Sequence, residues 1–125
     1  MIVKFAWLAL AGALGTIARY SLSGVVQRFS GGTFPWGTAV VNLVGCLVAG
    51  FLWALFEKKG VSYGLPRTII LVGFMGAFTT FSTLILQTTE MMRASELLYA
   101  SGNLVLQNGV GLLALVGGIY LGRLI

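Results

Sequence analysis

Polar side chains without charge recur at helical spacing inside the apolar segments of this chain. Thr38 and Asn42 are four residues apart, so on a helix they share one face. Tyr99, Asn103 and Gln107 repeat at the same interval and form a second polar stripe. Hydroxyl and amide groups can both donate and accept hydrogen bonds. Each stripe by itself is consistent either with hydrogen bonds between helices or with the wall of a polar pathway.

A run of glycines and hydroxylated residues lies in the middle of an apolar segment. Residues 73–83 read GFMGAFTTFST, and Gly and Thr are poor helix formers. Irregular backbone occurs at membrane depth only where protein buries it or where it lines a cavity, and freed carbonyls suit a small cation. The run is also consistent with an intact helix whose hydroxyls bond their own turn. Together with the two stripes it favours a broken helix and a polar pathway.

Charged side chains are scarce within the apolar segments. Arg19 is the only charge well inside one, and it is consistent with snorkelling or helix packing or with positive potential at the mouth of an anion pathway. The three acidic residues, Glu57, Glu90 and Glu96, fall in loops or at helix ends, and the chain has no His. Proton-coupled transporters usually need a titratable group within the membrane. A four-helix small multidrug-type exporter is therefore only the runner-up, and an enzyme is poorly supported.

Four apolar segments must position these polar groups. The chain has 125 residues, of which 58% are hydrophobic and 9% charged, whereas an average soluble domain carries about 25% charged residues. A soluble protein of this size could not bury so much apolar surface, but a bilayer can cover it. Each segment approaches the ~20 residues that cross the hydrocarbon core. The segments are 2–26, 36–56, 68–89 and 97–121. We expect an all-α membrane protein whose residues 1–125 form one four-helix transmembrane domain.

The basic residues lie mainly between or beside these segments. This distribution is typical of juxtamembrane anchoring and argues against a nucleic-acid partner, despite the net charge of +5. Four helices place both termini on one side of the membrane. That side would hold Lys4, Lys58, Lys59, Arg67 and Arg123, and the other Arg28 and Arg93. The excess of positive charge predicts that the termini are cytoplasmic.

Three ordered motifs resemble the Fluc (CrcB-like) fluoride channels, and the match runs through all four segments. Residues 12–20 read GALGTIARY, similar to the family's G-x-x-G-x-x-x-R-[YW]. Residues 37–45 read GTAVVNLVG, similar to its G-T-x-x-x-N-x-x-G. The most specific motif is residues 73–83, similar to its G-[FL]-x-G-x-x-T-T-F-S-T. The fourth segment carries polar residues at the family's polar positions.

The resemblance implies a particular assembly and function. It implies a dual-topology antiparallel homodimer with two pores along the subunit interface, which exports fluoride passively across the inner membrane. It also implies one structural Na⁺ at the dimer centre, held by the backbone carbonyls of Gly76 and Thr79 from both subunits. The chain has no internal repeat, so any two-fold symmetry must come from a partner subunit.

The resemblance also assigns residues to the ion pathway. Arg19 matches the family's vestibule arginine and Asn42 its pore asparagine. Phe81 matches the pore aromatic, whose electropositive ring edge would meet a desolvated fluoride ion. The full set of pathway residues is Arg19, Thr38, Asn42, Phe81, Ser82, Thr83, Tyr99, Asn103 and Gln107.

Two positions depart from the family's pattern. Leu84 stands where the second pore aromatic is usual, and Gln87 stands where a carboxylate is usual. Some relatives work as paired, non-identical subunits that each keep part of the pore. The departures and the charge bias leave three arrangements open: a homodimer, a heterodimer with a related subunit, and a non-conducting partner subunit of a heterodimeric channel.

Overall fold

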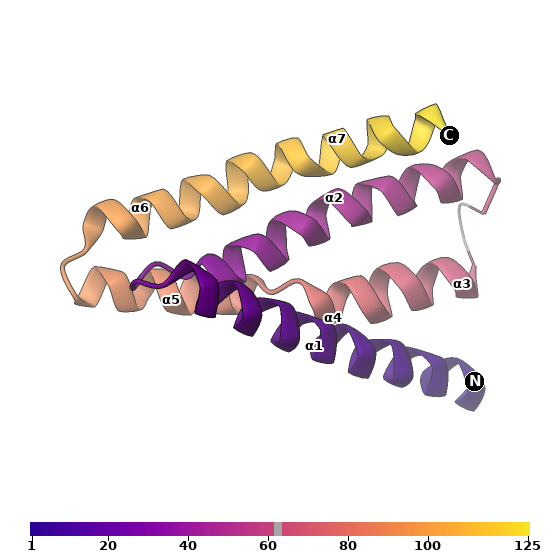
Figure 1. Ribbon diagram of the computed structural model, residues 1–125. Helices are drawn as coiled ribbons and strands as arrows, with labels where there is room; N and C mark the ends of the chain where they lie inside the picture. The colour runs from indigo at the N-terminus through magenta and orange to yellow at the C-terminus, as the bar shows by residue number, and fades with distance from the viewer. Residues whose placement is uncertain (62–63) are drawn as a thin grey trace.

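The computed structural model describes residues 1–61 and 64–125, and residues 62–63 lie outside this description. The described chain folds into four helical spans (Figure 1) that are long and apolar enough to cross a membrane. The first two spans are α1 (Ile2–Ser30) and α2 (Trp36–Lys58). The third span is α3 (Leu65–Arg67), the π-helix η1 (Thr68–Met75), α4 (Gly76–Phe78) and α5 (Phe81–Arg93). The fourth is α6 (Leu97–Val105), the π-helix η2 (Leu106–Val110) and α7 (Gly111–Leu124). The predicted all-α fold with four spans is confirmed.

The helices run two to four residues beyond the C-terminal limits of the apolar segments. The backbone N–H and C=O groups of a helix bond one another, so a helix does not have to end where its side chains become polar. Its last turn can extend into the headgroup region. The first helix ends where Gly31 and Gly32 adopt positive φ angles of 61° and 74°, a conformation that glycine adopts without steric cost. Pro66 lies in the first turn of α3, a position that proline tolerates.

Small residues allow α2 and α7 to pack backbone against backbone. A methyl group on Gly118 would clash with the Leu47 carbonyl oxygen, and one on Gly50 would clash with the Leu115 carbonyl oxygen. On Gly122 the methyl carbon would lie 2.6 Å from the Phe51 carbonyl oxygen. Such close approach is the usual role of glycine in membrane helix pairs.

The third span is interrupted at two threonines. Thr79 has φ −84° and ψ 157°, and Thr80 has φ −148° and ψ 110°, so both are extended. The α4 helix ends before them and α5 begins after them, which leaves a visible gap in the coil (Figure 1). The predicted break is present. The π-helix η1 before the break could not be predicted from the hydrophobic pattern, because its residues are as hydrophobic as those of an α-helix in the same position.

Both termini lie at the same end of the molecule, as four spans require (Figure 1). At this end Arg123 Nη2 lies 3.8 Å from Glu57 Oε2, and the Arg67 guanidinium lies 4.0 Å from the centre of the Trp53 ring. Cation–π contacts of this kind hold a charge beside an aromatic ring at the membrane boundary. Which side of the membrane this end faces remains a prediction.

The bundle has a small interior and a large apolar exterior. Its buried cluster consists of Val41, Met75 and Phe78, with partly buried neighbours around them. Many large hydrophobic side chains on all four spans are exposed, as expected where lipid or a partner subunit covers the helices. A dimer would use part of this exterior.

Candidate functional site

Asn42 occupies the centre of the candidate site and pairs with the broken backbone of the third span. The Thr80 N–H donates to Asn42 Oδ1 over 2.8 Å, and Asn42 Nδ2 donates to the Thr80 carbonyl oxygen over 3.1 Å. Asn42 is buried. Buried backbone groups need partners, and this one side chain supplies both for Thr80. Asn42 of α2 therefore stabilises the break in the third span.

Arg19 holds a second backbone group at the same break. Its Nε donates to the Ala77 carbonyl oxygen over 3.1 Å. In a continuous helix this carbonyl would accept from the N–H four residues later, at Phe81. Arg19 thus makes a contact between two spans, as the helix-packing alternative predicts. The positive charge lies against the C-terminal end of α4, where a helix dipole favours a cation.

Two carbonyls at the break lose their usual helical donors. The Gly76 carbonyl would accept from the Thr80 N–H, but that group donates to Asn42. The Thr79 carbonyl would accept from the Thr83 N–H, but that group donates to Thr80 Oγ1 over 3.3 Å. Gly76 is also exposed. Uncharged hard oxygen atoms such as these suit a small hard cation, so the donor chemistry fits the expected sodium site.

A chain of amide side chains runs from Asn42 into the fourth span. Asn42 Nδ2 donates to Gln107 Oε1 over 2.6 Å, and Gln107 Nε2 donates to Asn103 Oδ1 over 2.7 Å. Asn103 Nδ2 then donates to Thr88 Oγ1 over 3.0 Å. The structure thus joins Asn42 of the first predicted stripe to Gln107 and Asn103 of the second. Thr88 was not predicted, and its one sequence signal was a hydroxyl inside an apolar segment.

The hydroxyls beside the break cap the start of α5. Thr80 is the N-cap residue, and its hydroxyl accepts from the Thr83 N–H, donates to Thr83 Oγ1 over 2.9 Å and lies 3.4 Å from Ser82 Oγ. A side-chain oxygen at the N-cap satisfies an N–H that has no helical partner. Phe81 begins α5 and is 68% exposed on the single chain.

Tyr99 stands apart from the rest of its predicted stripe. It lies near the start of α6 and is half exposed, with its ring centre 6.2 Å from that of Phe34. The ring of Phe34 in turn lies 4.6 Å from that of Trp36. Tyr99 therefore belongs to an aromatic group at the end of the bundle, whereas Asn103 and Gln107 belong to the buried network.

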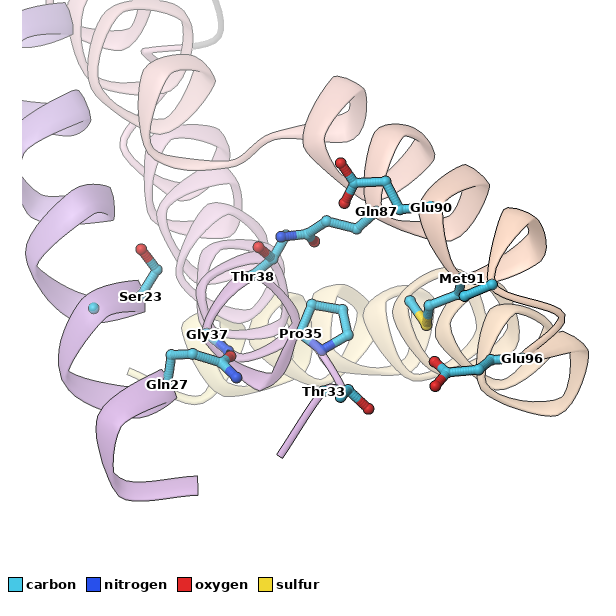
Figure 2. Close-up of a pocket in the computed structure, with 12 residues that line it drawn as sticks. Ser23, Gln27, Thr33, Pro35, Gly37, Thr38, Gln87, Glu90, Met91 and Glu96 are labelled. Atoms are coloured by element: carbon cyan, nitrogen blue, oxygen red, sulfur yellow. The ribbon is translucent and has the colours of Figure 1, made fainter. Parts of the chain in front are cut away.

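A cavity of about 550 Å³ opens at the end of the bundle opposite the termini. It lies between the last turns of α1 and α5 and the start of α2, and its polar lining includes Thr38, Gln87, Glu90 and Glu96 (Figure 2). The Gln87 side chain reaches toward Thr38 (Figure 2). Its Oε1 is buried and accepts no hydrogen bond from any described residue.

A second cavity of about 380 Å³ adjoins the break. Its lining includes Asn42, Thr79, Phe81, Leu84 and Gln107. Thr38 in the first cavity and Asn42 in the second are one helical turn apart on α2, and Gln87 and Leu84 are related in the same way on α5. The same faces of two helices therefore line both cavities. In the described part of the chain, no group of acidic, cysteine or histidine side chains could hold a metal ion.

Comparison with known proteins shows the family. The family model described as "CrcB-like protein, Camphor Resistance (CrcB)" matches residues 6–119, from α1 into α7. The chain belongs to the CrcB-like family. Its three motifs contribute the atoms that meet at the break: Arg19 from the first, Asn42 from the second, and the interrupted backbone from the third. With four spans and this family, the chain is a multi-pass membrane protein.

Curated relatives match the chain over nearly its whole length. A protein of Desulforapulum autotrophicum is 59% identical over 122 residues, 98% of each chain. One of Nitrosococcus oceani is 49% identical over the same shares, and one of Solidesulfovibrio magneticus is 46% identical over the full length of both. Each of these relatives is named "Fluoride-specific ion channel FluC".

Proposed function

We propose that this chain is a channel subunit that carries fluoride passively across the inner membrane of a bacterium. The observation that carries the proposal is the uncharged, donor-rich network that holds the break in the third span. It joins Thr80, Asn42, Gln107 and Asn103 through amide and backbone groups. Relatives similar over 98% of the chain are named as fluoride-specific channels. A channel provides a path down a gradient, and we infer no enzymatic activity.

We infer that a second subunit completes the pathway. Gly76, Phe81 and Ser82 are exposed on the single chain although they lie midway along the third span. Polar backbone at membrane depth must be covered by protein or line a cavity. An antiparallel copy would present the same break from the opposite direction and cover it. Two equivalent pores would then run along the interface, each entered through a cavity like that in Figure 2.

The proposed pathway meets fluoride with donors and with one positive charge. The ion would enter the larger cavity beside Thr38 and pass toward Asn42, with Arg19 supplying positive potential near the break. Further donors would come from hydroxyls of Ser82 and Thr83, and the ring edge of Phe81 would provide an electropositive contact. Tyr99, Asn103 and Gln107 complete the proposed lining. The driving force would be the ion's own gradient and the membrane potential.

The direct test is fluoride efflux from liposomes that contain only this chain. A fluoride-selective electrode should record rapid efflux when the membrane potential is collapsed with a potassium ionophore, and chloride loaded in place of fluoride should stay inside. Efflux of both ions at equal rates would contradict a fluoride-selective channel. No efflux above that of protein-free liposomes would reject the homodimeric channel.

A non-conducting or heterodimeric subunit is the second candidate. It is favoured by Leu84, which is 3% exposed and lines the cavity at the break where the family's second pore aromatic is usual. The excess of basic residues at the end with the termini also favours one fixed orientation. If this candidate is correct, the chain alone gives no efflux, and efflux appears only with a related subunit of opposite orientation.

We propose that Na⁺ binds at the dimer centre to the Gly76 and Thr79 carbonyls of both subunits. Bound there, Na⁺ would neutralise four converging carbonyl dipoles and hold the two breaks together. We expect the purified protein to melt at a higher temperature in NaCl than in KCl or N-methylglucamine chloride at equal ionic strength, because a ligand that binds only the native dimer stabilises it by mass action. Identical melting curves in the three salts would contradict the site.

We expect Glu90→Gln to raise fluoride flux at low salt. The Glu90 carboxylate is exposed in the wall of the larger cavity, where it repels an entering anion. The increase should be roughly twofold at about 10 mM salt and absent at about 1 M, where the Debye length falls to ~3 Å. Glu57→Gln is the control, because Glu57 lies at the other end of the bundle. An increase that persisted at high salt would contradict the electrostatic explanation.

A further inference from the structure

The amide network begins and ends on the backbone of one helix. Its first group is the Thr80 N–H, at the start of α5, and its last is the Leu84 carbonyl, one turn further on. Between them the hydrogen bonds pass through Asn42, Gln107, Asn103 and Thr88, with lengths of 2.8, 2.6, 2.7 and 3.0 Å, and a final bond of 2.7 Å runs from Thr88 Oγ1 to the Leu84 oxygen. The network is thus a closed loop through three spans.

Both ends of this loop impose the same direction on it. A backbone N–H can only donate and a backbone carbonyl can only accept. Thr88 has one hydroxyl proton and uses it on Leu84, so toward Asn103 it can only accept. Asn103 must then turn its NH₂ group to Thr88 and its oxygen to Gln107. The same step repeats from Gln107 to Asn42, whose oxygen faces the Thr80 N–H.

The order of donors and acceptors along the loop determines which atoms are still available to bind an ion. Each amide oxygen in the loop already accepts one hydrogen bond, and both N–H groups of Asn42 are used. An amide NH₂ has two hydrogens, and Gln107 spends one of them on Asn103. Gln107 lines the cavity at the break, and its second N–H has no acceptor among the described residues. We infer that this N–H is available as a donor to the cavity. An anion accepts from such a group, whereas a cation needs an oxygen.

We propose that Thr88 is a positioning residue that anchors the far end of this loop and thereby keeps the Gln107 N–H donor at the cavity wall. Thr88 lines neither cavity and acts through Asn103 and Gln107. The Thr80 backbone fixes the direction of the loop at Asn42, and without the Thr88 hydroxyl the Asn103 NH₂ group loses its acceptor, so that Asn103 and Gln107 are no longer held in place. The proposal rests on the proposed fluoride pathway and adds the group that makes its wall selective for an anion.

Three substitutions test the proposal in liposomes. Thr88→Val keeps the shape and removes the hydroxyl, and we expect fluoride efflux to fall by about tenfold or more, the scale expected for a lost buried hydrogen bond. Thr88→Ser restores the hydroxyl and should restore efflux. Thr89→Val is the matched control, because the Thr89 hydroxyl bonds the Ile85 carbonyl in the same way but is exposed. Wild-type efflux with Thr88→Val, or reduced efflux with Thr88→Ser alone, would indicate simple packing and overturn the proposal.

A second measurement does not depend on folding of a variant or on fluoride transport. In wild-type protein labelled with ¹⁵N-asparagine, the Asn103 side-chain amide, assigned by its loss in Asn103→Ser, should exchange its hydrogens with D₂O much more slowly than the exposed Asn108 amide. Exchange of the two amides at equal rates would overturn the loop. If wild-type protein passed no fluoride but the Asn103 amide still exchanged slowly, the proposed function would be wrong, whereas the hydrogen-bonded loop would be supported.

Discussion

We expect Asn42→Asp to abolish fluoride efflux and Asn42→Ala to lower it by at least about tenfold. The Asn42 NH₂ group donates to the Thr80 carbonyl and to Gln107 Oε1. A carboxylate cannot make either bond, because it has no hydrogen to donate. Its oxygen would face two other oxygens, and its negative charge would repel fluoride beside the break. Alanine removes the donors without adding the charge, so the difference between the variants isolates the electrostatic part.

The control for this prediction is Thr89→Ala. The Thr89 hydroxyl bonds the Ile85 carbonyl of its own span and Thr89 lines neither cavity, so its removal leaves the network intact and efflux should stay close to wild type. Size-exclusion profiles of all three variants check that each protein remains assembled. If assembled Asn42→Asp carried fluoride at the wild-type rate, Asn42 would not lie on the pathway.

We also expect Arg19→Met to remove most of the fluoride efflux. Arg19 bonds the Ala77 carbonyl at the end of α4 and places a positive charge near the break. Methionine supplies similar apolar bulk but neither the bond nor the charge. Arg19→Lys should give an intermediate rate, since it keeps the charge but lacks the planar guanidinium that bonds the carbonyl through Nε.

Salt dependence separates the two roles of Arg19. Attraction of an anion by a fixed charge weakens as ionic strength rises, so wild-type and Arg19→Lys efflux should fall with added inert salt, whereas this fall should be absent in Arg19→Met. Arg28→Met is the matched control, because Arg28 is exposed in the last turn of α1. Equal rates for the lysine, methionine and wild-type proteins would show that neither the hydrogen bond of Arg19 to Ala77 nor its positive charge contributes to fluoride efflux.

The four spans and the break were predictable because both depend on local composition. Hydropathy over about 20 residues sets membrane insertion, and two glycines followed by hydroxylated residues weaken a helix wherever they occur. The motif containing residues 73–83 placed the break correctly. The spacing of Thr38 with Asn42 and of Asn103 with Gln107 likewise predicted shared faces, since helical geometry relates residues four apart.

The partners of the polar groups were decided only by the tertiary structure. Six amide side chains and several hydroxyls lie in the spans, and each is chemically able to hydrogen-bond any other. The close packing of α2 against α7, which Gly50 and Gly118 allow, goes with the contact between Asn42 and Gln107. The packing of α5 against α6 brings Thr88, which has no spacing relation to either stripe, to Asn103. Hydrogen bonds extend over about 3 Å, so the register of one helix against another, which no local pattern encodes, determines which donor meets which acceptor.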